Sequence, residues 1–169
     1  MKRLVKTPGW VSTDYHNHST PSGDNTCGTA DRVINMAAEH LEFVPTTEHN
    51  RMFDWTPTIK SLGLEKVMST VPGIEFTGSG AHFNAFPFKP DPKKQDGGAP
   101  QWSKDPRLNA ITLRHFQDSD PDRWVHINHP SMQENFVDWN GDGLMDAMVV
   151  SLFTENEILI SDGQGGFAS

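Results

Sequence analysis

Short extended segments that end in histidine or glutamate alternate with helical segments along the first 130 residues of the chain. Extended segments are predicted at 10–15, 43–47, 71–77, 82–88 and 124–128, and helices at 30–40, 56–62 and 106–116. Thr29 is predicted to cap the first helix, and residues 89–104, rich in Pro, Asp, Gly and Lys, to form a loop. Strands that alternate with helices favour parallel pairing, so the sequence predicts an α/β fold.

The first predicted strand ends in Asp14-Tyr15-His16-Asn17-His18. Side chains two positions apart in a strand project to the same side, so His16 and His18 should hold two imidazoles together. Two neutral imidazoles on one element can bind a divalent metal ion. An isolated His-x-His is often a solvated strand end, but further motifs accompany this one.

These further motifs also lie at predicted strand ends or in the following loops: Thr47-Glu48-His49-Asn50, Pro72-Gly73-Ile74-Glu75, Ala81-His82-Phe83-Asn84 and His126-Ile127-Asn128-His129-Pro130. Imidazole with carboxylate suits zinc, iron or manganese, and ligand type does not choose among them. Glu75 could instead be a surface carboxylate, and His82 a packed core residue. His126 is expected either to support a metal-binding side chain or to have a structural role. Metal chemistry is the interpretation that accounts for the whole set.

Composition limits the classes of protein that remain. The length of 169 residues suits one domain, and the net charge of −8 argues against broad binding of nucleic-acid backbones. A small phosphorylated substrate remains compatible with that charge, because bound cations can supply positive charge locally. The single cysteine, Cys27, excludes an internal disulfide framework and a Cys-rich zinc site. We find no signal peptide and no membrane-spanning run in the sequence.

Taken in order, the motifs resemble those of the PHP family (polymerase and histidinol phosphatase domain), in particular its CehA/McbA-like metallohydrolase branch. The resemblance covers roughly Val11 to Pro130 and rests on Asp14-Tyr15-His16-Asn17-His18-Ser19, Thr47-Glu48-His49-Asn50, Gly73-Ile74-Glu75 and His129-Pro130. It implies a distorted seven-stranded β/α barrel with two or three divalent metals, Zn, Mn or Fe, at the C-terminal rim of the strands. That rim is where β/α barrels generally carry their active sites.

The resemblance also implies roles for individual residues. Its metal ligands would be His16, His18, Asp24, His49, Glu75, His82 and His129. In this scheme His16 and His18 hold the first metal, and Glu75 bridges the first and second. His82 and His129 complete the second site. His49 with Asp24 holds a third metal. Glu75 and His129 are the residues we assign to catalysis. Glu48 stands where the family usually has aspartate, and we expect it to support the ligands without binding metal.

One family motif has no counterpart. A closing Asp-x-His, which would complete the first and third sites, does not occur before Ser169. The chain is also short for seven strands, so the barrel is expected to be incomplete at the C-terminus and the sequence to be a fragment. We therefore expect weak, exchangeable metal and low turnover from this chain, and higher activity from a longer form.

The acidic tail suggests a second ion site. Residues 138–146 read Asp-x-Asn-x-Asp-Gly-x-x-Asp, with oxygen ligands available from Asp138, Asn140, Asp142 and Asp146. Oxygen side chains at alternate positions around a glycine suit calcium, although a polar turn without an ion is the competing interpretation. The tail also resembles an FG-GAP or VCBS-type repeat. We accordingly divide the chain into a PHP-like domain, 1–135, and a tail, 136–169, that either continues this domain or starts a propeller-type repeat.

The predicted function is that of a metal-dependent hydrolase, an enzyme that uses a metal-activated water to cleave a phosphoester or a carboxylic or carbamate ester. Its partner would be a small-molecule ester or phosphoester. The alternative, from a different class, is a non-catalytic metal- or calcium-binding interaction module at a cell surface. Metal content together with activity on generic phosphodiesters and aryl esters distinguishes the two.

Overall fold

The computed structural model describes residues 7–78, 81–120 and 122–129, and the backbone alone of 147–149, 157–161 and 167–168. The chain divides into two compact units. Unit 1 comprises Met1–Glu75 and Phe86–Ala99, and unit 2 comprises Phe76–Ala85 and Pro100–Ser169. The predicted division at residue 135 falls outside the described residues and stays a prediction.

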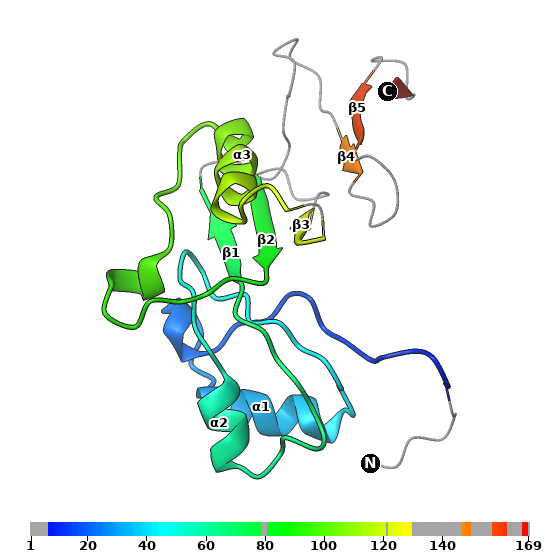
Figure 1. The fold of residues 1–169 in the computed structure, drawn as a ribbon, viewed down its shortest axis with the longest axis vertical. Helices are drawn as coiled ribbons and strands as arrows, with labels where there is room; N and C mark the ends of the chain where they lie inside the picture. The colour runs from blue at the N-terminus through cyan, green and yellow to red at the C-terminus, as the bar shows by residue number, and fades with distance from the viewer. Residues whose placement is uncertain are drawn as a thin grey trace. The chain divides into compact units, whose positions relative to one another are not determined.

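Two helices and an apolar cluster organise unit 1. Helix α1 spans Thr29–Ala38 and helix α2 spans Thr56–Ser61, and the two pack together (Figure 1). The buried residues of the cluster are Val33, Met36, Val44, Trp55, Ile59 and Met68. In α1 the buried residues Val33 and Met36 are three apart, the spacing of one helical face, so helix amphipathicity accounts for this contact.

Three extended segments of unit 1 lie side by side in parallel. Isolated parallel bridges join Thr13 to Phe43, Phe43 to Ser69, and His49 to Glu75. Helix α1 lies between the first two segments in the sequence and α2 between the second and third. This is the strand–helix–strand order of parallel β/α units. The predicted parallel association is present here as bridges, and the predicted strands at 10–15 and 43–47 do not form regular ladders.

Burial at this cluster leads to a prediction for stability. Ile59 is 4% exposed in α2, whereas Ile34 is 47% exposed in α1. Ile59→Val removes one buried methylene and should lower the free energy of unfolding by about 0.5–1.5 kcal/mol. Ile34→Val removes the same group from a solvated position and should change it by less than about 0.5 kcal/mol. Urea denaturation of both variants checks this, and equal losses would show that Ile59 is not in the core.

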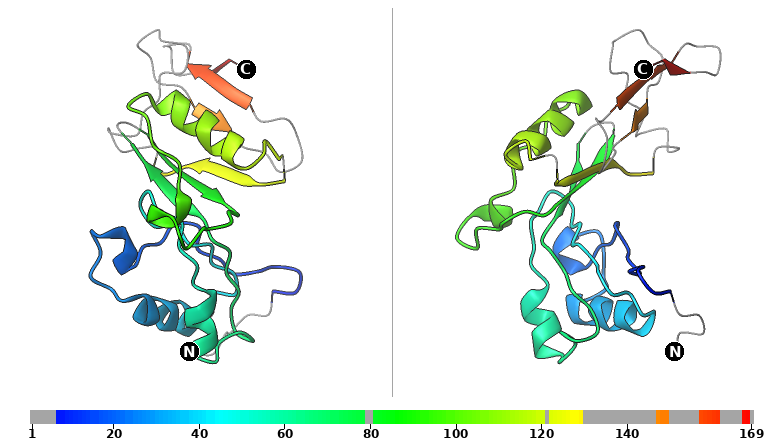
Figure 2. Two further views of the ribbon diagram at one scale, coloured as in Figure 1. Left: turned by 60° about the vertical axis from the view of Figure 1, so that its left-hand side comes forward. Right: turned by 45° about the vertical axis from the view of Figure 1, so that its right-hand side comes forward.

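An open three-stranded sheet follows in the order β1-β2-β3. Strand β1 spans Ile74–Thr77 and continues into unit 2, β2 spans His82–Phe86, and β3 spans Trp124–Ile127. Helix α3, Pro106–Phe116, packs beside β3 (Figure 2), and the Gln117 side chain donates to the Trp124 carbonyl over 3.0 Å. Short strands further along pair antiparallel, β4 (Ala147–Val149) with β5 (Glu157–Ser161) and β5 with β6 (Phe167–Ala168).

The mixed α/β class is confirmed, whereas the described residues form no closed barrel. The prediction of Thr29 as a helix cap is wrong. Gly28 is the N-cap, and the Thr29 hydroxyl lies 3.1 Å from that of Ser19. The predicted loop at 89–104 contains a short 3-10 helix, Gln95–Gly98. Among the described residues, every helix falls short of the length and apolar character needed to cross a membrane.

Candidate metal centre

Glu75 is the buried carboxylate around which the site of unit 1 is built. Its backbone is held by two hydrogen bonds to the neighbouring segment: the Glu75 N–H donates to the Glu48 carbonyl over 3.0 Å, and the Asn50 N–H donates to the Glu75 carbonyl over 2.8 Å. The side chain is 0% exposed. A carboxylate removed from water in this way needs close polar or cationic partners.

Histidine ring nitrogens supply such partners on both carboxylate oxygens. His16 Nε2 lies 3.3 Å from Glu75 Oε1, while His18 Nε2 lies 3.1 Å and His49 Nδ1 2.9 Å from Oε2. The rings of His18 and His49 stack with centroids 4.3 Å apart. Both oxygens of the buried carboxylate therefore have imidazole nitrogens close to them.

The two histidines of the first motif come together, although the segment that carries them is not a regular strand. Their Nε2 atoms are 3.1 Å apart. The Asp14 carboxylate accepts the His16 backbone N–H over 2.9 Å, and Arg32 Nε donates to the His18 carbonyl over 2.8 Å. Side-chain hydrogen bonds, not a β-ladder, hold this backbone.

His49 contacts a carboxylate at each ring nitrogen. Its Nδ1 faces Glu75, and its Nε2 lies 3.0 Å from Oδ2 of Asp24, which is more exposed. The hydrogen bond to Glu75 is the main reason that the pKa of His49 is raised above its ordinary value, with the charges of Glu75 and Asp24 adding to the effect. Asp24 and His49 are thus brought together, on the side of the ring opposite Glu75.

The spacing of these donor atoms fits a small divalent cation. His18, His49 and Glu75 each offer one ligand atom within 4.8 Å of the others. Ligand atoms about 2.0–2.1 Å from a tetrahedral zinc ion lie roughly 3.3 Å from one another, close to the nitrogen–oxygen distances of 2.9–3.3 Å around Glu75. Two histidines and one glutamate are also a donor set of catalytic zinc sites, which leave a further position open.

Sequence reasoning missed two serines next to this cluster. Ser19 is the N-cap and Ser22 the last residue of a short 3-10 helix, Thr20–Ser22, and both donate hydrogen bonds to the buried carboxylate of Glu48. Through Ser22, Glu48 is linked by hydrogen bonds to the backbone of the candidate ligand His49, and its expected supporting role stays a prediction. In the sequence, two serines follow His18 within four residues, but serines are equally common in a polar loop with no role at a site.

The other predicted ligands lie in unit 2 or outside the described residues. The rings of His82 and His129 are near each other, with centroids 5.1 Å apart, and the Asn128 N–H donates to the His82 carbonyl over 2.9 Å. Trp124 Nε1 donates to His126 Nδ1 over 2.5 Å, in agreement with a structural role for His126. The possible calcium ligands Asp138, Asn140, Asp142 and Asp146 fall outside the described residues.

The His49 interaction leads to a pH prediction for the metal-free protein. A raised folded-state pKa stabilises the protein fully below the unfolded value near 6.5, and this contribution disappears as pH rises through the raised pKa. The free energy of unfolding should therefore fall as the pH rises from about 6.5 through the raised pKa of His49, and His49→Gln should reduce that fall. Urea denaturation at several pH values measures it. An identical pH dependence in the variant would contradict the assignment.

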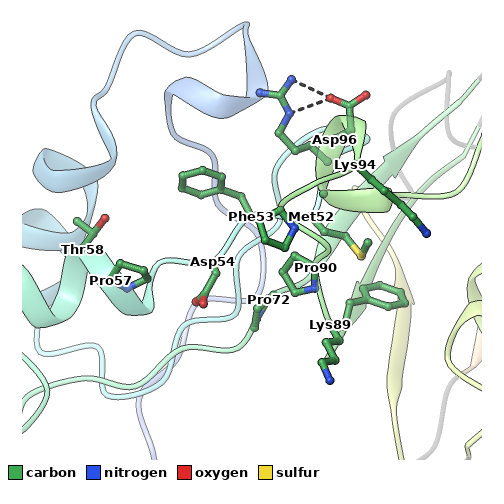
Figure 3. Close-up of a pocket in the computed structure, with 14 residues that line it drawn as sticks. Met52, Phe53, Asp54, Pro57, Thr58, Pro72, Lys89, Pro90, Lys94 and Asp96 are labelled. Carbon is green, nitrogen blue, oxygen red and sulfur yellow. Dashed lines mark hydrogen bonds and ion pairs between the residues drawn. The ribbon is translucent and has the colours of Figure 1, made fainter.

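A cavity of about 790 Å³ lies in the same unit, and its lining residues do not include His16, His18, His49 or Glu75. Apolar side chains from three stretches of the chain line it, among them Met52, Phe53, Pro72, Phe88 and Pro90 (Figure 3). Arg51 also lines the cavity and joins two loops by hydrogen bonds. Its guanidinium donates to Asp96 Oδ1 over 2.8 and 3.0 Å and to the Pro21 carbonyl over 3.1 Å. The cavity is therefore joined by hydrogen bonds to the loop that carries Ser22 and Asp24.

Comparison with known proteins adds no assignment: no protein-family model, no curated protein and no solved structure matches this chain.

Proposed function

We propose that this protein is a metal-dependent hydrolase of the PHP type. The observation that carries the proposal is the fully buried Glu75 carboxylate with three histidine ring nitrogens 2.9–3.3 Å from its oxygens. Such a cluster of lone pairs in a buried position is energetically reasonable when a cation accepts them. The motif order that resembles the PHP family supports the same conclusion independently of the geometry.

In this proposal His18, His49 and Glu75 would hold one cation, and Glu75 with His16 would contribute to a second. The grouping differs from the one that the resemblance implies, in which His16 and His18 share the first metal and His49 with Asp24 holds a third. When bound, such cations supply an activated water and polarise the ester bond under attack. Glu75 would offset part of the charge of the bound cations. Asp24, near the outer nitrogen of His49, keeps that ring oriented. His82 and His129 remain, by resemblance, ligands of a second cation.

The same proposal extends to the fold. The bridges of unit 1 run parallel, and the candidate ligands His16, His18 and His49 follow the bridged residues Thr13 and Phe43, whereas Glu75 is the second residue of β1. The placement of the histidines is the one found in β/α barrels, whose sites form at the C-terminal ends of the strands. A PHP-type barrel is accordingly the architecture we propose for the whole domain.

The cavity suggests what kind of substrate is cleaved. A volume near 790 Å³ with mainly apolar walls suits an organic group of moderate size. We therefore favour a phosphoester or carboxylic ester whose leaving group is apolar or aromatic. Thr58, on α2, lines this cavity, whereas Ser61, on the same helix, does not. Thr58→Phe should raise KM for aryl esters, and Ser61→Phe is the matched control.

Metal titration together with hydrolysis tests the proposed function. Chelator-treated protein should take up Zn²⁺, Mn²⁺ or Fe²⁺ and, once loaded, should cleave bis(p-nitrophenyl) phosphate or p-nitrophenyl esters. Chelation should abolish the turnover, and returning the metal should restore it. Stoichiometric metal without turnover on either substrate class would instead favour the non-catalytic binding module. Failure to bind any of the three ions would contradict the proposal altogether.

A further inference from the structure

Ser22 occupies the centre of a hydrogen-bond network that joins two candidate ligands to a buried carboxylate. Its Oγ lies 3.0 Å from His18 Nδ1, accepts the His49 backbone N–H over 3.1 Å, and donates to Glu48 Oε2 over 2.5 Å. Glu48 is itself 0% exposed. Its two oxygens also accept the Ser19 backbone N–H, over 2.9 Å and 3.2 Å, and the Ser19 hydroxyl.

The direction of each hydrogen bond at Ser22 follows from the number of protons available. A serine hydroxyl has one proton and two lone pairs. The proton is directed to Glu48, and one lone pair is taken by the His49 N–H, which can only donate. The remaining lone pair must accept a proton from His18 Nδ1. A neutral His18 in this network therefore carries its proton on Nδ1.

This tautomer determines which nitrogen of His18 can bind a cation. With the proton on Nδ1, the lone pair is on Nε2, the atom that lies 3.1 Å from Glu75 Oε2 and 3.1 Å from His16 Nε2. We infer that Ser22 and Glu48 are positioning residues that set the tautomer of His18, so that its Nε2 is presented to the metal centre. This inference rests on the proposed metal-binding function and adds to it how one ligand is prepared.

The arrangement is similar to the hydrogen bonds that orient the ligands of known metal sites. A metal-bound histidine generally donates its other ring N–H to a carboxylate, a carbonyl or a water, which fixes the ring and its tautomer. Here a hydroxyl stands between the histidine and the carboxylate. Because the same hydroxyl accepts the His49 N–H, Ser22 also ties the backbone of a second ligand to the side chain of the first.

Nitrogen-15 NMR of the histidine rings in the full, metal-free chain tests the inference without any need for turnover. In its neutral form, His18 should show a protonated Nδ1 and an unprotonated Nε2. Ser22→Ala removes the acceptor and should shift His18 toward a mixture of tautomers. Ser22→Thr keeps the hydroxyl and should restore the wild-type signal. His18 protonated on Nε2 in the wild-type chain would overturn the inference.

Ser19→Ala is the matched control. Ser19 bonds the same Glu48 carboxylate, but its side chain makes no contact with His18 among the hydrogen bonds of the described residues. It should leave the His18 tautomer unchanged, whereas a tautomer shift equal to that of Ser22→Ala would overturn the direct role of Ser22.

The affinity for Zn²⁺, measured by competition with a chelator, provides a second readout. Ser22→Ala should weaken binding by about 10- to 100-fold, the usual effect of removing a hydrogen bond to a ligand, and Ser22→Thr should recover most of it. An unchanged affinity in Ser22→Ala would overturn the positioning role. A chain with the Nδ1-protonated tautomer that binds no metal would instead refute the proposed function and leave the hydrogen-bond assignment intact.

Discussion

Glu75→Gln is expected to weaken the binding of divalent metal by roughly 10²- to 10³-fold, the size of effect that follows when one partner of a buried charge pair is lost. Glutamine keeps the shape of the side chain but removes the negative charge at the point where the histidine nitrogens meet. Equilibrium dialysis against Zn²⁺ or Mn²⁺, with a competing chelator, measures the change.

Occupancy should fall at both cation positions together, because the two oxygens of Glu75 face different histidines. Loss of one equivalent, with the other retained at normal affinity, would identify Glu75 as a terminal ligand. In the metal-free protein, Glu75→Gln should also remove the interaction that raises the pKa of His49, so the stability that this interaction adds at low pH should be lost. Glu39→Gln changes an exposed carboxylate just after α1 and should leave metal binding unaltered.

The double variant His16→Ala/His18→Ala should lose its bound transition metal while the fold persists. Both rings lie outside the apolar cluster of unit 1 and keep part of their surface in solvent, 33% for His16 and 19% for His18. Truncating them should therefore cost little packing energy. Metal analysis after dialysis, with far-ultraviolet circular dichroism as the check on folding, decides the outcome.

His115→Ala is the appropriate control, because it removes an exposed imidazole from α3 in unit 2. It should not alter the metal content. If the double variant retained the wild-type metal stoichiometry, His16 and His18 would not be ligands, and the candidate centre would reduce to His49 with the two carboxylates near it.

Elements with local signals were predictable from the sequence. Helix α3 has both of its predicted ends, Pro106 and Phe116: the Asp105 side chain accepts the Arg107 N–H at its start, and a proline occupies its first turn. The pairing of His16 with His18 was expected from strand alternation, but the segment is not a regular strand, and side chains of Asp14 and Arg32 hold its backbone. The ends of α3 depend on neighbours along the chain, and their physical cause is visible in the sequence.

The centre itself was decided by tertiary structure. Glu75 meets His49 because hydrogen bonds join two segments about 26 residues apart, including the one from the Glu75 N–H to the Glu48 carbonyl. The proton on His18 depends on Ser22 and on Glu48, 30 residues away in the sequence. Residue spacing identified which side chains can bind a cation. Only the packing of distant segments determines which atoms converge and which lone pair each ring presents, because those depend on hydrogen bonds that no local pattern encodes.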